Sequence, residues 1–264
     1  DAEEIDEVCC GVANIGDGPT GGLVRLLGGD LVGNDPFAYE NYQDFDPANK
    51  IETQGTSLHV DYNFDSFSLT SITAFRTLDQ FQSGDVDFTS ARLISPSAAD
   101  TRHTKIDTFT QELRLTSTTD GPLQWMVGAF YFNEEVEHDE TFGLGPAFRP
   151  YVDGLLAAAG APVNLAFIEG ALGVPVGTFY AEGTGNLLED YALDDETLSL
   201  FAQFDIDLTD ALTLTVGANY TSSEKEASAD VVNNNLFGTL PLAAIGLGGL
   251  ESAQFLPPFV TYPN

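Results

Sequence analysis

The sequence predicts an all-β protein of antiparallel up-and-down hairpins, with about six strands and long irregular loops. Apolar and polar residues alternate in several segments, as they do in strands whose two faces meet different surroundings. Short turns join these segments in pairs, and much longer segments join one pair to the next. The 26 Gly and 13 Pro residues also disfavour long helices.

Three regions follow from this pattern. Residues 1–54 have no sustained period and contain turn-forming runs, so we expect a long irregular loop there. Residues 55–227 hold three hairpins of barrel type with long connecting loops. Residues 228–264 are expected to form a Gly- and Pro-rich loop or tail.

Each predicted hairpin pairs two alternating segments. The first pairs residues 58–64 with 67–75, and the second pairs 105–117 with 123–141. The third has the most regular alternation and joins two strands at Thr209 and Asp210. In its first strand the apolar residues share one parity: Leu198, Leu200, Ala202, Phe204, Ile206 and Leu208. Each strand therefore has one apolar face and one polar face.

The connections are short on one side of the sheet and long on the other. The long ones cover residues 84–104 and 142–196, and residues 155–161 and 165–172 are expected to form short helices. Outer-membrane barrels show this asymmetry, and a strand such as 212–220, about 26 Å long, covers about 20 Å of bilayer at a tilt of roughly 40°. The hairpins are therefore predicted to belong to an outer-membrane-type barrel, with four aromatic anchors at the membrane boundaries: Tyr62, Trp125, Tyr131 and Tyr220.

Several runs resemble the barrel strands of TonB-dependent receptors from the outer membrane of Gram-negative bacteria. They are residues 55–62 with 69–76, residues 109–117, and residues 123–135. The resemblance implies a receptor that binds and imports a scarce nutrient of the siderophore, cobalamin or oligosaccharide class. It also implies three partners, namely the rest of the barrel, a plug domain and the TonB complex, and it requires no cofactor.

The length of the chain bears on this interpretation. At about 44 residues per strand, a receptor barrel of about 22 strands would need roughly 970 residues, so the chain is expected to be a fragment of such a receptor. A second hypothesis is a receptor-derived β protein that acts as a self-assembling subunit of an extracellular filament. In that case copies of the chain would add edge to edge, because free strand edges favour such pairing.

The charge of the chain limits its partners. Nine Lys and Arg residues against 41 Asp and Glu residues give a net charge of −32, which excludes nucleic acid. The densest acidic cluster is a weak candidate for Ca²⁺, at Glu134, Glu135, Glu137, His138, Asp139 and Glu140. The commoner interpretation of such a cluster is a solvated strand end, and Asp85 and Asp87 are interpreted in the same way.

No catalytic motif accompanies the remaining candidates, so an enzyme is not predicted. The three histidines, His59, His103 and His138, lie far apart in the sequence. Cys9 and Cys10 are adjacent, and three possibilities stay open for them: a disulfide between these neighbours, partners outside this chain, or free thiols.

Overall fold

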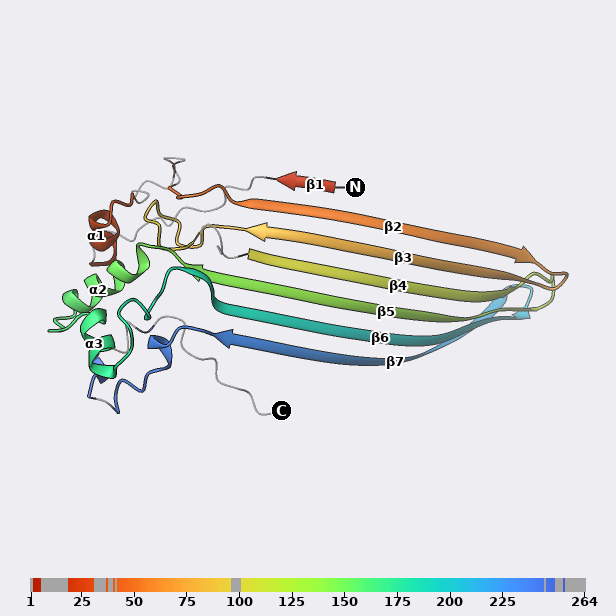
Figure 1. Ribbon diagram of the computed structural model, residues 1–264. Coiled ribbons are helices and arrows are strands. Elements are labelled where there is room, and N and C mark those ends of the chain that lie inside the picture. Colours follow the sequence, from red (N-terminus) through yellow and green to blue (C-terminus); the bar gives the residue numbers. More distant parts are fainter. Residues whose placement is uncertain are drawn as a thin grey trace.

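The computed structural model describes residues 2–5, 19–30, 37, 40, 42–95, 101–244, 246–249 and 254. It consists of one antiparallel sheet in which each strand pairs with the next along the chain (Figure 1). The strands are β1 (Ala2–Ile5), β2 (Ala48–Asn63), β3 (Phe67–Ser83), β4 (Thr101–Ser117), β5 (Leu123–Leu144), β6 (Gly183–Thr209) and β7 (Leu212–Asn233). Six long strands and the short β1 thus form the up-and-down arrangement that alternation predicts.

The helices lie together at one end of the sheet, and the short turns lie at the other (Figure 1). The helices are α1 (Pro19–Leu26), α2 (Phe148–Ala158), α3 (Leu165–Leu172) and the 3-10 helix η1 (Phe237–Thr239). We call these two places the loop end and the turn end. None of the described helices is long and apolar enough to cross a membrane.

The strands extend further toward the loop end than the sequence predicts. β2 begins at Ala48 rather than 55, β4 at Thr101 rather than 105, and β6 at Gly183 rather than 197. In these extensions both faces are largely polar, so the apolar alternation that marks a half-buried strand is missing. Regular antiparallel pairing with the neighbouring strands defines them instead. The expected loops 84–104 and 142–196 are correspondingly shorter.

Helix positions were predicted in part. Residues 165–172 form α3 as expected, because Asn164 Oδ1 accepts the Phe167 N–H at 2.9 Å and Gly173 ends the helix at φ 71°. The helix expected at 155–161 instead runs over residues 148–158. Pro150 is compatible with this earlier start, because proline is tolerated in the first turn of a helix. The range 1–54, expected to be irregular, contains β1, α1 and the start of β2.

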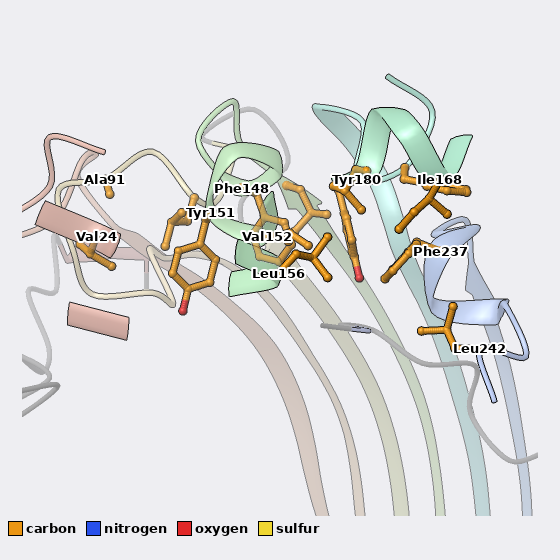
Figure 2. Close-up of a cluster of buried hydrophobic side chains, with 14 residues drawn as sticks. Val24, Ala91, Phe148, Tyr151, Val152, Leu156, Ile168, Tyr180, Phe237 and Leu242 are labelled. Carbon is orange, nitrogen blue, oxygen red and sulfur yellow. The ribbon is translucent and has the colours of Figure 1, made fainter. Parts of the chain in front are cut away.

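The main apolar core lies at the loop end and not within the sheet. Its buried side chains come from α1, the 84–95 loop, the β5–β6 connection and η1 (Figure 2). We call these segments the loop layer. Among the described residues, the core comprises Val24, Ala91, Leu93, Leu144, Phe148, Tyr151, Val152, Leu156, Leu165, Ile168, Phe179, Tyr180, Phe237 and Leu242. Apart from Leu144 at the end of β5, the long strands therefore contribute none of their large apolar side chains to this core.

Candidate functional site

One face of the sheet carries an exposed band of apolar side chains. Leu198, Phe204, Leu214 and Val216 are 44%, 39%, 44% and 51% exposed, although all lie in the β6–β7 ladder. Isolated exposed apolar residues are ordinary, but many exposed apolar side chains on one face of several strands mark a surface that contacts something other than water. The predicted separation of apolar and polar parities onto two faces is therefore present in the structure.

Aromatic residues lie at both ends of this apolar band. At the turn end, the Tyr62 and Phe64 ring centroids are 4.6 Å apart, and Phe67 lies 6.5 Å from Trp125. Toward the loop end, Phe109 and Tyr131 are 6.2 Å apart, and Tyr220 is 67% exposed. The four predicted anchors, Tyr62, Trp125, Tyr131 and Tyr220, thus share the apolar face. Their contact with membrane stays a prediction.

The loop-end boundary of the band crosses the sheet obliquely. One row of directly paired residues runs from β3 to β7: Phe75, Phe109, Asn133, Glu196 and Glu224. The row begins with aromatic residues and ends with acids, and on β7 the last aromatic residue, Tyr220, lies four residues nearer the turn end than Glu224. Four residues are about 13 Å along a strand and four strand spacings about 19 Å across, so a line from Phe75 on β3 to Tyr220 on β7 slopes by about 35° across the sheet. Outer-membrane barrels have tilts in this range.

The opposite face is mainly polar on β6 and β7, where side-chain hydrogen bonds join the strands. Thr215 Oγ1 donates to Asp205 Oδ1 at 2.6 Å, and Ser199 Oγ and Thr221 Oγ1 are 2.8 Å apart. Lys225 Nζ lies 2.7 Å from Asp195 Oδ2. A face of this composition suits contact with water or a polar domain, as in the interior of a large barrel.

Strand geometry divides the six residues of the acidic cluster between the two faces. Glu134, His138 and Glu140 lie on the polar face, where Thr108 donates to Glu134 at 3.1 Å and His138 Nδ1 lies 2.8 Å from Thr104 Oγ1. Glu135, Glu137 and Asp139 lie on the other face. The part of the chain that the structure describes contains no group of three or more His, Cys, Asp or Glu side chains arranged to hold a metal ion. The cluster is therefore not one site.

Acidic residues instead form rows beyond the loop-end boundary of the apolar band. Asp190 is paired directly with Asp139 on β5 and with Asp230 on β7. These three residues line a shallow hollow of about 360 Å³. Desolvation and the carboxylates of Asp139 and Asp230 raise the pKa of Asp190. The rows make this part of the surface strongly negative.

The three histidines lie on three strands and contact separate partners. His59 Nε2 is 3.1 Å from Asp61 Oδ2 on β2, and His103 Nε2 is 3.0 Å from Asp79 Oδ1 across the β3–β4 pair. His138 contacts Thr104, as described above. The structure does not bring the three together.

A buried ion pair connects the helices of the loop layer. Arg149 at the start of α2 binds Glu169 in α3 through two bonds, of 2.8 Å and 2.7 Å. Glu169, which is 0% exposed, also accepts the N–H groups of Phe179 at 2.6 Å and Gly177 at 2.9 Å. Burial alone would raise the pKa of Glu169, but these hydrogen bonds outweigh it and hold the pKa below its ordinary value. We call this arrangement the Arg149–Glu169 pair.

Three aspartates connect the segment before β2 to the loop after β3. Asp85 is 2% exposed and accepts the N–H of Asp44 at 3.3 Å and that of Asp87 at 3.1 Å. Burial, followed by the charge of Asp85, raises the pKa of Asp44 to about 6. Burial also raises the pKa values of Asp85 and Asp87. The sequence interpretation of Asp85 and Asp87 as solvated acids is therefore wrong, and Asp44 was missed.

One of these features had a usable signal in the sequence. Glu169 is the single charged residue between Asp153 and Glu182, a spacing that indicates a buried, paired acid in a chain this acidic. Asp44 had no comparable signal, because its partners lie about 40 residues away. Cys9 and Cys10 lie outside the described residues.

One comparison with known proteins, the match to a family model, agrees with the geometry. The family model described as TonB dependent receptor-like, beta-barrel matches residues 12–246. A comparison with curated proteins gave no match. Among solved structures, the chain is similar to the ferric yersiniabactin uptake receptor FyuA from Yersinia pestis, with 14% sequence identity and a TM-score of 0.43. The alignment covers 70% of this chain and 25% of that one, so the chain spans about a quarter of that receptor.

Proposed function

The chain belongs to the TonB-dependent receptor-like β-barrel family, and on this premise we propose that it forms part of a receptor that imports a scarce nutrient. It supplies one stretch of barrel wall in the outer membrane of a Gram-negative bacterium, together with part of the ligand-facing loops. The observation that carries this proposal is the exposed apolar band with aromatic residues at both of its ends. Hydrocarbon is the surrounding in which such a band is stable.

The parts of the structure have distinct roles in this proposal. The apolar face contacts lipid, and the polar face borders the interior, where a plug domain would pack. The loop layer has its own core and is the first part that a ligand from outside would contact. The ligand belongs to the siderophore, cobalamin or oligosaccharide class, and uptake depends on the TonB complex. Binding and transport, rather than a chemical reaction, are the proposed activity.

Charged substitutions on the two faces of β7 test the wall assignment. Val216 lies midway along the apolar stretch of β7, and Asn219 lies on the polar face of the same strand. A Lys at the bilayer midplane of a barrel costs about 2–4 kcal/mol on the lipid face. We expect Val216→Lys to lower the amount of folded receptor in the outer-membrane fraction. Asn219→Lys, the matched control, should leave that amount close to wild type. Equal effects of the two substitutions would contradict a lipid-facing surface.

Edge-to-edge assembly is the second candidate, and the open side of the sheet favours it. In the described part of the chain, β7 pairs with β6 along one side only. In a receptor, further strands would cover the other side, whereas in a filament a second copy would do so. Electron microscopy of the natural protein with and without detergent separates the two. Regular filaments would support assembly, and a detergent-dependent particle would support the receptor.

A further inference from the structure

The three-aspartate cluster joins two segments that are separate in the sequence. Asp44 lies in residues 42–47 before β2, and Asp85 and Asp87 lie in the 84–95 loop after β3. The backbone N–H groups of Asp44 and Asp87 both donate to the Asp85 carboxylate, at 3.3 Å and 3.1 Å. A single buried side chain thus fastens the first segment to the second.

Other carboxylate oxygens in the cluster are buried without a hydrogen-bond partner. They are Oδ1 and Oδ2 of Asp44 and Oδ2 of Asp87. By contrast, Oδ1 of Asp87 accepts both the N–H and the hydroxyl of Thr89, at 2.9 Å and 2.6 Å. A buried ionised oxygen without a donor is costly, whereas a protonated carboxyl can donate to a neighbouring carboxylate.

The charged groups facing the cluster do not offset three negative charges. Asp44 faces Asp85 and the cation of Arg92, and Asp87 faces Asp85 and Asp44. The other contributions to Asp85 and Asp87 are hydrogen bonds from Thr89, from the backbone of Asp44, Asp87 and Phe88, and from the side chain of Asp87 to Asp85. Phe88 has a φ of 54°, a backbone conformation that is unfavourable for an L residue and persists only where surrounding contacts hold it.

We propose that Asp44, Asp85 and Asp87 form a proton-operated latch between residues 42–47 and the 84–95 loop. The latch is closed while the carboxyl groups share protons, and it opens when all three ionise and repel one another. Deprotonation releases protons to solvent and breaks no covalent bond. The inference rests on the loop geometry and does not depend on the proposed import function.

The position of the latch determines what its opening changes. The 84–95 loop is held independently to the rest of the loop layer, because the Gly145 N–H donates to the Leu93 carbonyl at 2.7 Å and the Ala147 N–H to that of Arg92 at 3.0 Å. Ala91 and Leu93 are also buried in the apolar core. The 42–47 segment is therefore the part that separates, at the side of the loop layer next to β2.

The direction of the pH effect follows from the raised pKa values. The closed form binds more protons than the open form, so closure is favoured at low pH and weakens as pH rises through the closed-state pKa. Asp44 alone, with a pKa of about 6 when closed and an ordinary value of about 3.9 when open, increases the opening equilibrium about tenfold between pH 5 and pH 8. Deprotonation of the other two aspartates adds to this increase.

Hydrogen exchange of the intact protein in detergent micelles tests the latch. After correction for intrinsic exchange rates, protection of the Asp44 amide, which bonds to Asp85 across the latch, should fall at least about tenfold between pH 5 and pH 8. Asp44→Asn should remain protected at pH 8, because the amide carries no charge and can donate to the neighbouring carboxylates. Asp46→Asn is the matched control, since Asp46 is exposed in the same segment, and it should behave as wild type.

Three outcomes would overturn the proposal. The first is equal wild-type protection of the Asp44 amide at pH 5 and pH 8. The second is a loss of protection at pH 8 in Asp44→Asn that matches wild type. The third is full recovery of protection when CaCl₂ is added at pH 8, which would make the cluster a cation site. Peptides from β3 and β5 report whether each variant is folded, and Asp87→Asn, with the same expected behaviour, replaces Asp44→Asn if that variant does not fold.

Discussion

We predict that Arg149→Met destabilises the loop layer, because it breaks the Arg149–Glu169 pair. Methionine keeps much of the apolar stem of arginine but removes both bonds to Glu169. Glu169 is 0% exposed, so water cannot replace the lost cation. The N–H groups of Phe179 and Gly177 remain as its donors. The substitution therefore leaves a buried carboxylate without a counter-charge.

The expected size of the effect follows from that burial. Removing one partner of a buried pair costs about 3–5 kcal/mol, because the other charge stays behind. Lys225→Met is the matched control. Its ion pair with Asp195 has the same 2.7 Å separation, but Lys225 is 61% exposed. An exposed pair is worth about 0–1 kcal/mol. The two substitutions thus compare one ion-pair distance at two degrees of burial.

Hydrogen exchange of peptides from residues 148–180 measures the effect, with β3 peptides as an internal reference. Arg149→Met should lower the free energy of opening of this segment by several kcal/mol while the sheet stays protected. Adding Glu169→Gln should restore part of the loss, since a neutral amide is less costly to bury than a carboxylate. Unchanged protection in Arg149→Met would refute the reasoning, and so would a double variant that is as unstable as the sum of the single ones.

Three further predictions concern the acid sensitivity of the region around Glu169, the packing at Gly145, and the depth of Trp125 in a bilayer. Because the folded structure lowers the pKa of Glu169, the ionised side chain stabilises the loop layer fully above the ordinary carboxyl pKa of about 4.3. This stabilisation is lost as pH falls through the folded-state pKa, so hydrogen exchange of the 165–180 amides should accelerate in acid. Gly145→Ala would place a Cβ 2.7 Å from the Ile94 carbonyl oxygen, so the variant should lose protease resistance at the 84–95 loop while a Gly170→Ala control, with open space around it, should not. Trp125 is the single tryptophan, and in bilayers its fluorescence should be quenched more by labels near the headgroups than by labels at the chain ends. Stronger quenching by the labels at the chain ends would show that Trp125 does not lie at the membrane boundary.

The sequence predicted the parts of the fold that have a local pattern. Alternation in 198–208 and 212–220 identified the strands, their turn and the apolar parity, because each residue's face depends only on its position along the strand. The same logic placed Tyr62, Trp125, Tyr131 and Tyr220 on one face. Beyond the apolar band this signal ends, since residues such as Asp190 and Tyr191 are exposed or half-buried on both faces.

The loop layer could not be predicted in the same way, because its contacts join distant segments. Val24, Phe148 and Phe237 share one core although more than 80 residues separate each from the next. The same holds for Asp44 and Asp85, whose burial depends on how two loops pack. Acidic residues in a loop are usually solvated, and only the tertiary structure shows that these are not.

In the proposed receptor, the tilt of the strands would also determine how much of the barrel's perimeter this chain supplies. At a tilt of about 35°, each strand occupies about 6 Å of circumference, so six strands form an arc of about 35 Å. A closed ring of about 22 strands would measure about 130 Å around and about 41 Å across. The segments packed around Phe148 and Phe237 would then rim roughly a quarter of the opening. Solutes entering along this arc would meet a rigid rim, since its side chains are already packed against one another.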